Sequence, residues 1–345
     1  MFPDELRKFV LRRWGGRSGL QDRLASASSP HPELRHLAQS LLQDGRIRFN
    51  NGSRAEGMAC VSAAVKLDPS VICEPWDLLP LLEAEGRSNF RERLDARLRA
   101  WYHLPDRRVH AAVSLLSKKP EMRAWIGDLG LPLPKLYAGP VALGALDWGS
   151  LPPDVVIKPV NGANSDGLVV SKGGIDVMRG QPALPDLQEY VSQLYSKIFK
   201  SPPQVLVEEL LVDVHAEKDQ TLQIPRDFKV FTVAGHAGFT RVFDRNDPSG
   251  KRSLASYDRD GRRLPPSREG WREAPKGVVL PEGYSDLIKM AELISQKLPW
   301  LLRLDFYLTD RGPVFGEFTT YPGAGRGLTP FSDRTLLQMW ELWPD

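Results

Sequence analysis

Cysteine is scarce in this sequence: Cys60 and Cys73 are the only two among 345 residues. Two cysteines cannot build a disulfide scaffold or a cysteine-ligated metal site, and such sparse use suits a reducing cytosol. Apolar runs are short as well, since none approaches the ~18–20 residues that cross a bilayer. Residues 2–14 contain Asp4 and Glu5 and lack the apolar stretch of a signal peptide. We therefore expect a cytoplasmic protein without a membrane span.

An excess of one charge sign is also missing. The chain has 46 Lys and Arg against 43 Asp and Glu, a net charge of +3. That excess is too small to indicate binding to nucleic acid or to an anionic membrane. The hydrophobic share of 41% and the charged share of 26% are those of a globular protein and exclude wholesale disorder. The length of 345 residues suggests two or three domains.

The first third of the chain has helical patterns, and the remainder alternates strands with helices. Residues 33–69 carry apolar residues at helical spacing, which fits a tetratricopeptide-like helix pair with its turn at 50–52. An ordinary two-helix hairpin is the alternative. Residues 91–101 mix arginines with acidic residues, which is typical of a solvated helix face. We expect an all-helical region over 1–105, acting as a cap or a docking module for a protein partner, followed by an α+β part over 106–345.

Hydrophobic periodicity predicts the elements of the second part. A short helix should run from Pro120 to Leu129, with Gly130 just past its end. Strands are expected at 154–159, 168–171, 204–209, 227–234, 239–244, 301–309 and 313–319, and further helices at 185–199 and 284–298. Residues 245–282 are rich in Gly, Pro, Ser and Arg and are predicted to form a long loop, which inside a domain is usually functional or mobile.

Two carboxylates near the C-terminal end of the chain are predicted to face each other. Residues 310–312 fit a three-residue hairpin loop whose glycine supplies the positive φ. That loop pairs Thr309 with Pro313 and therefore Asp305 with Glu317, with their Cβ atoms about 5 Å apart.

Facing like charges destabilise a sheet unless something positive lies between them. Mg²⁺ typically takes one or two carboxylates together with substrate phosphates, so the pair predicts a magnesium site. Thr319 lies two residues further along the same face of the strand and offers a hydroxyl. The alternatives are a register slip, or an arginine that neutralises both carboxylates, for which Arg303 is the next residue on that face.

A lysine near a strand end is followed by a loop of small residues. Val155-Val156-Ile157-Lys158-Pro159 reads as a buried strand, and the loop over 161–167 would let backbone N–H groups approach phosphate oxygens closely. Leu168 stands where a P-loop would have its lysine, and a strand instead of a helix follows the loop, which excludes the Rossmann fingerprint. A surface lysine at a strand end is the alternative for Lys158.

Two further segments carry candidate ligand contacts. The apolar strand from Gln204 runs into Glu208 and Glu209, where backbone groups could bond an adenine edge and Asp213 could reach a ribose. A solvated acidic turn explains this segment equally well. Residues 226–245 place Lys229, Arg241 and other basic side chains on two paired strands, which predicts either a phosphate clamp or a surface salt-bridge ladder.

Taken in order, these motifs form a recognisable set. They are IKPVNGANSDG at 157–167, VEELLVD at 207–213, RDFKVFTVAG at 226–235 and RLDFYLTDRGPVFGEFTTYPGAG at 303–325. LSKKPEMRAWIGDLGLPLP at 116–134 is similar to the lysine-bearing helix that precedes an ATP-binding subdomain. The set resembles the ATP-grasp superfamily, and most closely its teichuronopeptide-biosynthesis (TupA-like) family, over about two-thirds of the chain.

The resemblance implies an α+β ATP-grasp fold in which two subdomains grip ATP. Its parts would be a pre-ATP segment over 106–150, a lysine, glycine-loop and hinge subdomain over 151–212, and a metal-carboxylate subdomain over 213–345. The ATP contacts implied are Lys158, the loop residues Gly162, Ala163, Asn164, Ser165 and Gly167, the hinge residues Glu208, Glu209, Leu210 and Leu211, and Asp213. Mg²⁺ would be held by Asp305, Glu317 and Thr319, the last at a position where many relatives have Asn.

The resemblance also implies the chemistry. ATP-grasp enzymes usually transfer the γ-phosphoryl group of ATP to a carboxylate, and an amine then attacks the acyl phosphate. Such a reaction needs positioning and charge neutralisation, for which Lys229 and Arg241 are candidates. Arg241, Arg245, Tyr321 and the turn at 323–327 would line the pocket for the second substrate. We expect a carboxylate–amine ligase acting on small-molecule or peptide substrates in natural-product or cell-envelope polymer biosynthesis. A phosphotransferase, or an interaction protein with a degenerate nucleotide domain, is the alternative.

Overall fold

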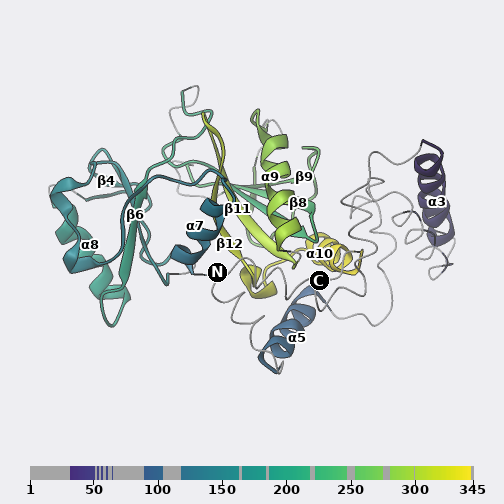
Figure 1. Ribbon diagram of the computed structural model, residues 1–345, viewed down its shortest axis with the longest axis horizontal. Coiled ribbons are helices and arrows are strands. Elements are labelled where there is room, and N and C mark those ends of the chain that lie inside the picture. Colours follow the sequence, from purple (N-terminus) through teal and green to yellow (C-terminus); the bar gives the residue numbers. More distant parts are fainter. Residues whose placement is uncertain are drawn as a thin grey trace.

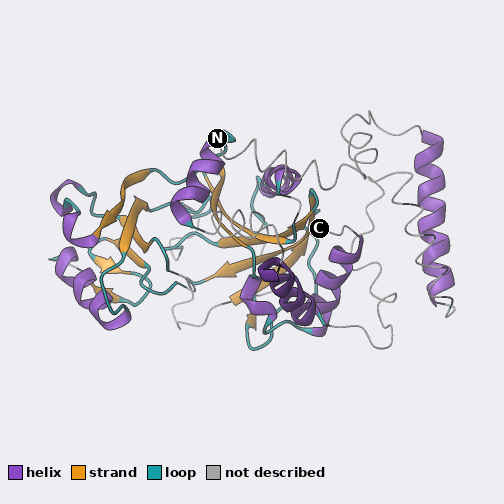
Figure 2. Ribbon diagram, turned by 60° about the horizontal axis from the view of Figure 1, so that its bottom comes forward, coloured by secondary structure: helices purple, strands orange, loops and turns teal. Residues whose placement is uncertain are grey.

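Two β-sheets organise the molecule (Figure 1). The computed structural model describes residues 32–50, isolated positions between 53 and 64, residues 89–103 and residues 118–342, except 163–164, 184–185, 218–221, 247–252, 275–279 and 299. Within these residues each sheet has six strands. Figure 2 shows the strands in two groups, with helices outside each group.

The first sheet has the strand order β1-β6-β2-β3-β4-β5. Its strands are β1 (Leu136–Ala142), β2 (Val155–Pro159), β3 (Val169–Lys172), β4 (Ile175–Asp176), β5 (Gln181–Pro182) and β6 (Gln204–Glu209). Helix α8 (Leu187–Ile198) packs against this sheet through Val191 and Tyr195. The side chain of Asp186 starts α8 by accepting a hydrogen bond from the backbone N–H of Glu189, as an N-cap does.

The second sheet has the order β10-β9-β8-β7-β11-β12. Its strands are β7 (Asp227–Val233), β8 (His236–Asp244), β9 (Ser253–Asp258), β10 (Arg272–Glu273), β11 (Leu302–Thr309) and β12 (Gly312–Thr319). One face is apolar and packs against α9 (Tyr284–Lys297) and α7 (Lys119–Asp128), with Phe228, Val230, Leu304 and Phe306 in that core. Because side chains alternate along a strand, the residues between these point to the opposite face.

The other face of the second sheet is covered at one end by α10 (Pro330–Leu342) and α5 (Phe90–His103). The core there contains Phe231, Phe239 and Met339. The short 3-10 turn η5 (Pro322–Gly325) leads into this helical layer. The rest of that face carries the charged side chains of the candidate site, which are described below.

The α+β prediction is confirmed, and each strand predicted from periodicity is present with bounds that differ by three residues or fewer. Helices α7, α8 and α9 also match their predicted ranges. The predicted long loop at 245–282 is different, because it contains β9 and β10. Strand β9 has the sequence SLASYD and is buried at all six positions. Its small and polar residues give no apolar alternation, which is why periodicity missed it.

Two helices of the N-terminal region are described. Helix α3 (Pro32–Asn50) falls in the predicted helix pair and includes Asn50, the first residue of the turn predicted at 50–52, whereas residues 51–52 and most of the second helix lie outside the described residues. Helix α5 begins with a capping box, in which Asn89 and Glu92 each accept a hydrogen bond from the other's backbone N–H.

Helix α5 is more than the solvated helix that its charges suggest. Phe90 and Leu94 are fully buried against α10 and the second sheet. Arg97 is 8% exposed, and its guanidinium donates to the backbone carbonyl oxygens of Leu301 at 3.1 Å and Thr320 at 2.6 Å. The expected boundary at 105/106 would cut this helix away from the core that it completes. We propose that the second part of the chain begins before Phe90.

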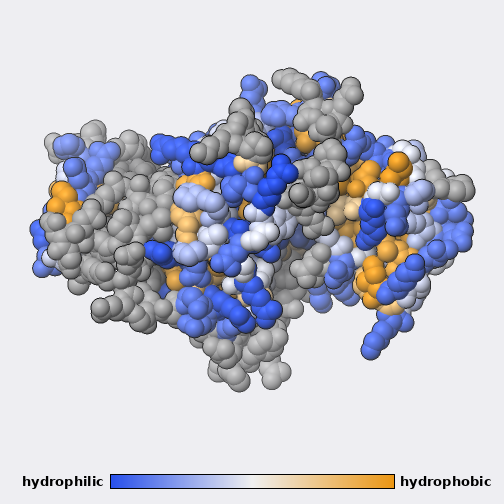
Figure 3. All heavy atoms as spheres, turned by 180° about the vertical axis from the view of Figure 1, so that it is seen from behind, coloured by the Kyte–Doolittle hydropathy of each residue, from blue (hydrophilic) through white to orange (hydrophobic). Residues whose placement is uncertain are grey.

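The outer surface carries few large apolar residues. Seven are exposed among the described residues: Leu37, Ile47, Val212 and Leu293, and three that belong to the first sheet and α8, namely Leu136, Ile175 and Ile198. Orange side chains gather at that end of the molecule, at the right of Figure 3, within a largely hydrophilic surface. None of the helices described in the structure is long and apolar enough to cross a membrane.

Candidate functional site

A cleft of about 1050 Å³, open to solvent, lies between the two sheets. The first sheet contributes its lysine, glycine loop and hinge, and the second contributes the charged ends of β7, β8, β11 and β12. The lining residues include Lys119, Lys158, Gly162, Ser165, Glu208, Glu209, Leu210, Leu211, Asp227, Lys229, Arg245, Asp305, Tyr307 and Glu317. Segments far apart in the sequence therefore meet at one site.

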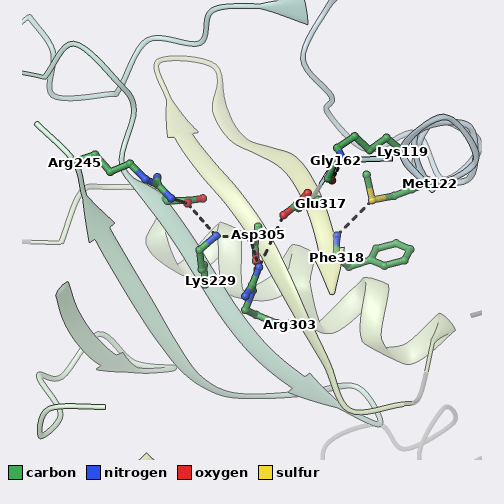
Figure 4. Close-up of polar contacts among 10 residues, drawn as sticks. Lys119, Met122, Gly162, Lys229, Arg245, Arg303, Asp305, Glu317 and Phe318 are labelled. Atoms are coloured by element: carbon green, nitrogen blue, oxygen red, sulfur yellow. Dashed lines mark hydrogen bonds and ion pairs between the residues drawn. The ribbon is translucent and has the colours of Figure 1, made fainter. Parts of the chain in front are cut away.

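A row of four charged side chains crosses the second sheet. Arg241 on β8 pairs with Lys229 on β7, Lys229 pairs with Asp305 on β11, and Asp305 pairs with Glu317 on β12. Residues that are directly opposite share a face of the sheet, so the row runs from two cations to two carboxylates. Figure 4 shows Lys229, Asp305 and Glu317 on the same side of their strands.

The facing of Asp305 and Glu317 is confirmed, but the register that produces it is not the predicted one. The hairpin loop has two residues, because Thr309 pairs with Gly312, and Leu308 instead of Thr309 pairs with Pro313. Gly316 is then the extra residue of a bulge between Phe315 and Glu317, and the bulge restores the facing pair. A Cβ on Gly316 would lie 3.0 Å from the Tyr307 ring and 3.2 Å from the Asp305 carbonyl oxygen, which explains the glycine.

Cations surround Asp305. Lys229 donates to Asp305 and also pairs with Asp227 at 2.9 Å. The Arg303 guanidinium donates to Asp305 through Nε at 2.7 Å and Nη2 at 2.8 Å, and its Nη2 lies 3.9 Å from Glu317 Oε1. Arg303 therefore lies beside both carboxylates, as the alternative to a metal ion in the sequence analysis predicted. Burial alone would lower the pKa of Arg303, but the negative charges of Asp305 and Glu317 raise it.

A second acid lies one step along the same face. Asp227 accepts from Lys229 and, at 2.8 Å, from Arg245 Nη2. Burial alone would raise the pKa of Asp227, but the charges of Lys229 and Arg245 hold it well below its ordinary value. Asp227 is therefore an anion that pairs with both Lys229 and Arg245 at the floor of the cleft.

Glu317 and Asp305 differ in what they can offer a metal ion. The Glu317 side chain is 45% exposed and lines the cleft, whereas Asp305 is nearly buried among its cations. No group of three or more His, Cys, Asp and Glu residues suited to a metal occurs in the described part of the chain. Two hard carboxylates beside a cleft fit Mg²⁺, which completes its coordination with waters and phosphate oxygens.

The first sheet supplies a second set of charges around Glu208. Lys158 Nζ lies 2.5 Å from Glu208 Oε2, and Arg123 Nη1 donates to Glu208 Oε1 at 2.6 Å. Glu208 is 3% exposed, and its ion pairs with Lys158 and Arg123 offset the free-energy cost of burying its carboxylate. Lys158 is therefore a cleft lysine and not the surface lysine of the alternative interpretation.

Two contacts tie the glycine loop and the hinge to their surroundings. Lys119 Nζ donates to the Gly162 carbonyl oxygen at 2.6 Å, and burial lowers the pKa of Lys119. Glu209 accepts from Arg311 Nη2 and from the Lys135 backbone N–H, both at 2.7 Å. Arg311 belongs to the β11–β12 loop, so this ion pair bridges the two sheets.

The remaining predicted residues are placed as follows. Ser165 and Gly167 have positive φ, and a Cβ on Gly167 would lie 2.8 Å from the Phe199 ring. Ala163 and Asn164 lie outside the described residues. Thr319 pairs with Arg303 across the hairpin. Asp213 is buried, with its carboxylate held by Arg226 Nε at 2.9 Å and Nη2 at 2.7 Å, so in this structure it serves an ion pair and not the cleft.

The candidate second-substrate residues do not lie together. Arg245 lines the cleft between the sheets, whereas Arg241 is buried and donates to the Ser267 hydroxyl and carbonyl oxygens. Tyr321 donates to Asp95 of α5. A Cβ on Gly325 would lie 2.7 Å from the Arg91 backbone, so α5 is packed closely against the turn that was expected to line a pocket.

Sequence reasoning missed three charged residues of the site, namely Lys119, Arg123 and Asp227, and named Arg303 only within the alternative to a metal site. Arg303 stands two residues from Asp305 on a strand and therefore shares its face. Asp227 has the same relation to Lys229. Lys119 and Arg123 are four residues apart on α7, which places them on one helix face.

Comparisons with known proteins gave one family match and several similar solved structures. A family model described as TupA-like ATP-grasp matches residues 142–337. Solved structures that are similar include a D-alanine–D-alanine ligase from Helicobacter pylori, at 16% identity and a TM-score of 0.40, covering 67% of this chain and 62% of the ligase. A second is the Bacillus anthracis D-alanine–D-alanine ligase complexed with ATP, at 13% identity and a TM-score of 0.40, covering 66% of each chain.

A third similar structure is the ATP-grasp ligase PsnB, complexed with a phosphomimetic variant of its minimal precursor, Mg and ADP. It has 12% identity and a TM-score of 0.37, covering 86% of this chain and 74% of PsnB. A search of curated proteins gave no significant match. The family model spans more than half of the chain and takes in strands from both sheets; the chain therefore belongs to the TupA-like ATP-grasp family.

Proposed function

We propose that this protein is an ATP-dependent carboxylate–amine ligase that works with Mg²⁺ and forms an amide or peptide bond through an acyl phosphate. Its acid and amine would be small molecules or peptides used in natural-product or cell-envelope polymer biosynthesis. The observation that carries the proposal is the row from Lys229 through Asp305 to Glu317, which opens into a cleft shared with Lys158 and the hinge.

The nucleotide would lie in the cleft between the sheets. The hinge from Glu208 to Leu211 would bind the adenine through backbone groups, and Lys158 would bind phosphate oxygens. The loop from Gly162 to Gly167 would cover the phosphates, with Lys119 holding its Gly162 end. Asp213 has no part in this arrangement because Arg226 and backbone N–H groups already occupy its carboxylate.

Asp305 and Glu317 would hold Mg²⁺, with the hydroxyl of Thr319 as a further oxygen on the same face. The ion would supply charge neutralisation to the phosphates. The chain's own cations do the remaining electrostatic work. Lys229 and Arg303 converge on Asp305 from both sides, where they can stabilise negative charge as it develops on the transferred phosphoryl group. Asp227 positions Lys229 and Arg245 for that task.

The experiment measures ADP release by the full chain with Mg-ATP across a panel of acids and amines. We expect release that requires one acid and one amine together, and ¹⁸O transfer from the labelled acid carboxylate to inorganic phosphate. Glu317→Gln should abolish both signals. Phosphate transfer that is complete without an amine would instead show a phosphotransferase. Nucleotide binding without turnover across the panel would contradict the proposal.

A further inference from the structure

Tyr307 lines the cleft but takes no part in the charged row. It stands on β11, two residues beyond Asp305. Because side chains alternate along a strand, the two side chains share the face of the second sheet that borders the cleft. Tyr307 is half-buried there. The metal carboxylates therefore have an aromatic alcohol as a neighbour, on the side nearer the β11–β12 loop.

The hydroxyl of Tyr307 makes no hydrogen bond to the described part of the chain. It is also not one of the buried polar atoms that lack a partner there, so solvent in the cleft reaches it. By contrast, Tyr190 donates to Asp176 Oδ2 and Tyr284 donates to the Asp258 carbonyl oxygen, both at 2.7 Å. A phenolic hydroxyl can donate one hydrogen bond and accept others. Tyr307 therefore offers an unused donor and acceptor at the surface of the cleft.

The bulge in β12 sets the position of the Tyr307 ring. A Cβ on Gly316 would lie 3.0 Å from Cε2 of the ring and 3.7 Å from Cδ2. The ring therefore occupies space that a side chain at position 316 would need. Gly316 thus has two effects, because it restores the facing pair of carboxylates and also leaves room for the tyrosine beside them.

Along the cleft, Tyr307 lies between the hinge and the metal carboxylates. At the hinge end, the backbone N–H of Val214, three residues past Leu211, donates to the carbonyl oxygen of Leu308 at 3.0 Å. At the other end, the backbone of Asp305 is two residues away, which is about 7 Å at the rise of an antiparallel strand. A nucleotide with its base at the hinge and its phosphates at Asp305 therefore has its sugar at the level of Tyr307.

The residue that the sequence analysis suggested for the sugar is already engaged. The carboxylate of Asp213 accepts hydrogen bonds from the guanidinium and backbone N–H of Arg226 and from the backbone N–H of His215. A hydroxyl suits this place better than a further acid would, since another negative charge beside Asp305 and Glu317 would be repelled by both. Sugar hydroxyls donate and accept hydrogen bonds, as the tyrosine hydroxyl does.

We propose that the hydroxyl of Tyr307 binds the ribose of ATP through one of the sugar's two free hydroxyl groups. The inference rests on the proposed function and adds to it a contact that selects the nucleotide. It makes Tyr307 the residue by which this protein distinguishes a ribonucleotide from a deoxyribonucleotide. One neutral hydrogen bond changes an affinity by about 2- to 13-fold, which sets the size of the expected preference.

The test is titration calorimetry on the full chain with Mg²⁺ and three nucleotides, namely ATP, 2′-deoxy-ATP and 3′-deoxy-ATP. We expect the wild-type protein to bind ATP about 2- to 13-fold more tightly than one of the two deoxy analogues. Tyr307→Phe keeps the ring beside Gly316 and removes only the hydroxyl. It should weaken ATP binding by the same factor and leave the affinity for that analogue unchanged, so that the preference disappears.

Tyr137→Phe is the matched control, because Tyr137 lies on β1 and does not line the cleft, and it should keep the preference. Equal wild-type affinities for the three nucleotides, or a preference that survives Tyr307→Phe, overturn the inference. An equal loss for all three nucleotides in Tyr307→Phe also overturns it, since the hydroxyl would then act on the base or a phosphate. A wild-type protein that binds no ATP contradicts the proposed function and this inference with it, whereas the other results are obtained with ATP bound and concern the sugar contact alone.

Discussion

Lys158 and Glu208 form the ion pair at the first-sheet side of the cleft. Lys158→Ala should weaken Mg-ATP binding by about 10- to 150-fold, the effect of one charge-assisted contact. The fold should persist because Glu208 keeps Arg123 as its partner at 2.6 Å. Calorimetry measures the affinity, and Lys200→Ala, a change at an exposed lysine beyond α8, is the control. Equal affinities in both variants would remove Lys158 from the nucleotide site.

His236 gives the protein a predictable response to acid. It begins β8 next to the β7–β8 turn, and burial, followed by the charge of Arg259, lowers its pKa to about 4. An unfolded histidine titrates near 6.5, so between pH 6.5 and 4 the unfolded chain binds more protons and the native state loses stability as pH falls.

His236→Gln should remove this part of the pH dependence, which we expect to be of order 1 kcal/mol since solvent reaches part of the ring. Urea unfolding at pH 7 and pH 4.5 measures it. The free energies of unfolding of the two proteins should diverge only at the lower pH. An identical pH dependence in both proteins would show that His236 titrates normally in the folded state.

At the scale of elements, the β11–β12 hairpin shows which structural features can be predicted from sequence patterns and which cannot. The facing of Asp305 and Glu317 was predictable, because the alternation of side chains along each strand and the short connection between the two strands allow few registers. The two-residue loop and the bulge were not predictable. The loop is one residue shorter than expected and the bulge at Gly316 adds one unpaired residue, so both registers bring Asp305 opposite Glu317. The missed strand β9 has a different cause, since its burial comes from neighbouring strands and not from apolar side chains.

Gly316 makes this element testable. Gly316→Ala would place a Cβ 3.2 Å from the Asp305 carbonyl oxygen and 3.0 Å from the Tyr307 ring. Relief of those contacts must shift the bulge, so we expect a loss of about 1–3 kcal/mol in stability together with weaker Mg²⁺-dependent ATP binding. Gly144→Ala is the control, because nothing lies within 4 Å of the added Cβ. Unaltered metal dependence in Gly316→Ala would show that the bulge does not set the carboxylate pair.

At the scale of the whole molecule, α5 joins the N-terminal region to the domain that holds the site. Sequence patterns separated the helical first third from the α+β remainder, but they could not show that Phe90 and Leu94 complete a core built by α10 and the second sheet. The reason is that a charged helix with a narrow apolar stripe looks solvated until its partner is known. Arg97 strengthens the same junction through the backbone of residues 301 and 320.

Two shortened chains test where the domain begins. A chain that starts at residue 86 keeps α5 and should fold and bind Mg-ATP. One that starts at residue 106 loses the buried side chains of Phe90 and Leu94, and each such loss costs roughly 2–5 kcal/mol. We expect it to be insoluble or unstable in thermal unfolding. A stable, ATP-binding protein from residue 106 would restore the original boundary and make α5 dispensable.

The central claim is that Asp305 and Glu317 hold the Mg²⁺ that accompanies ATP, and titration calorimetry of ATP with and without Mg²⁺ tests it most directly. Wild-type protein should bind ATP only with Mg²⁺. Glu317→Gln should lose that binding while its metal-free unfolding free energy changes by less than about 0.5 kcal/mol, because Glu317 is half exposed and, among the described residues, makes one ion pair, at 3.9 Å. ATP binding that is indifferent to Mg²⁺, or a Glu317→Gln protein that is strongly destabilised yet still binds Mg-ATP, would contradict the account.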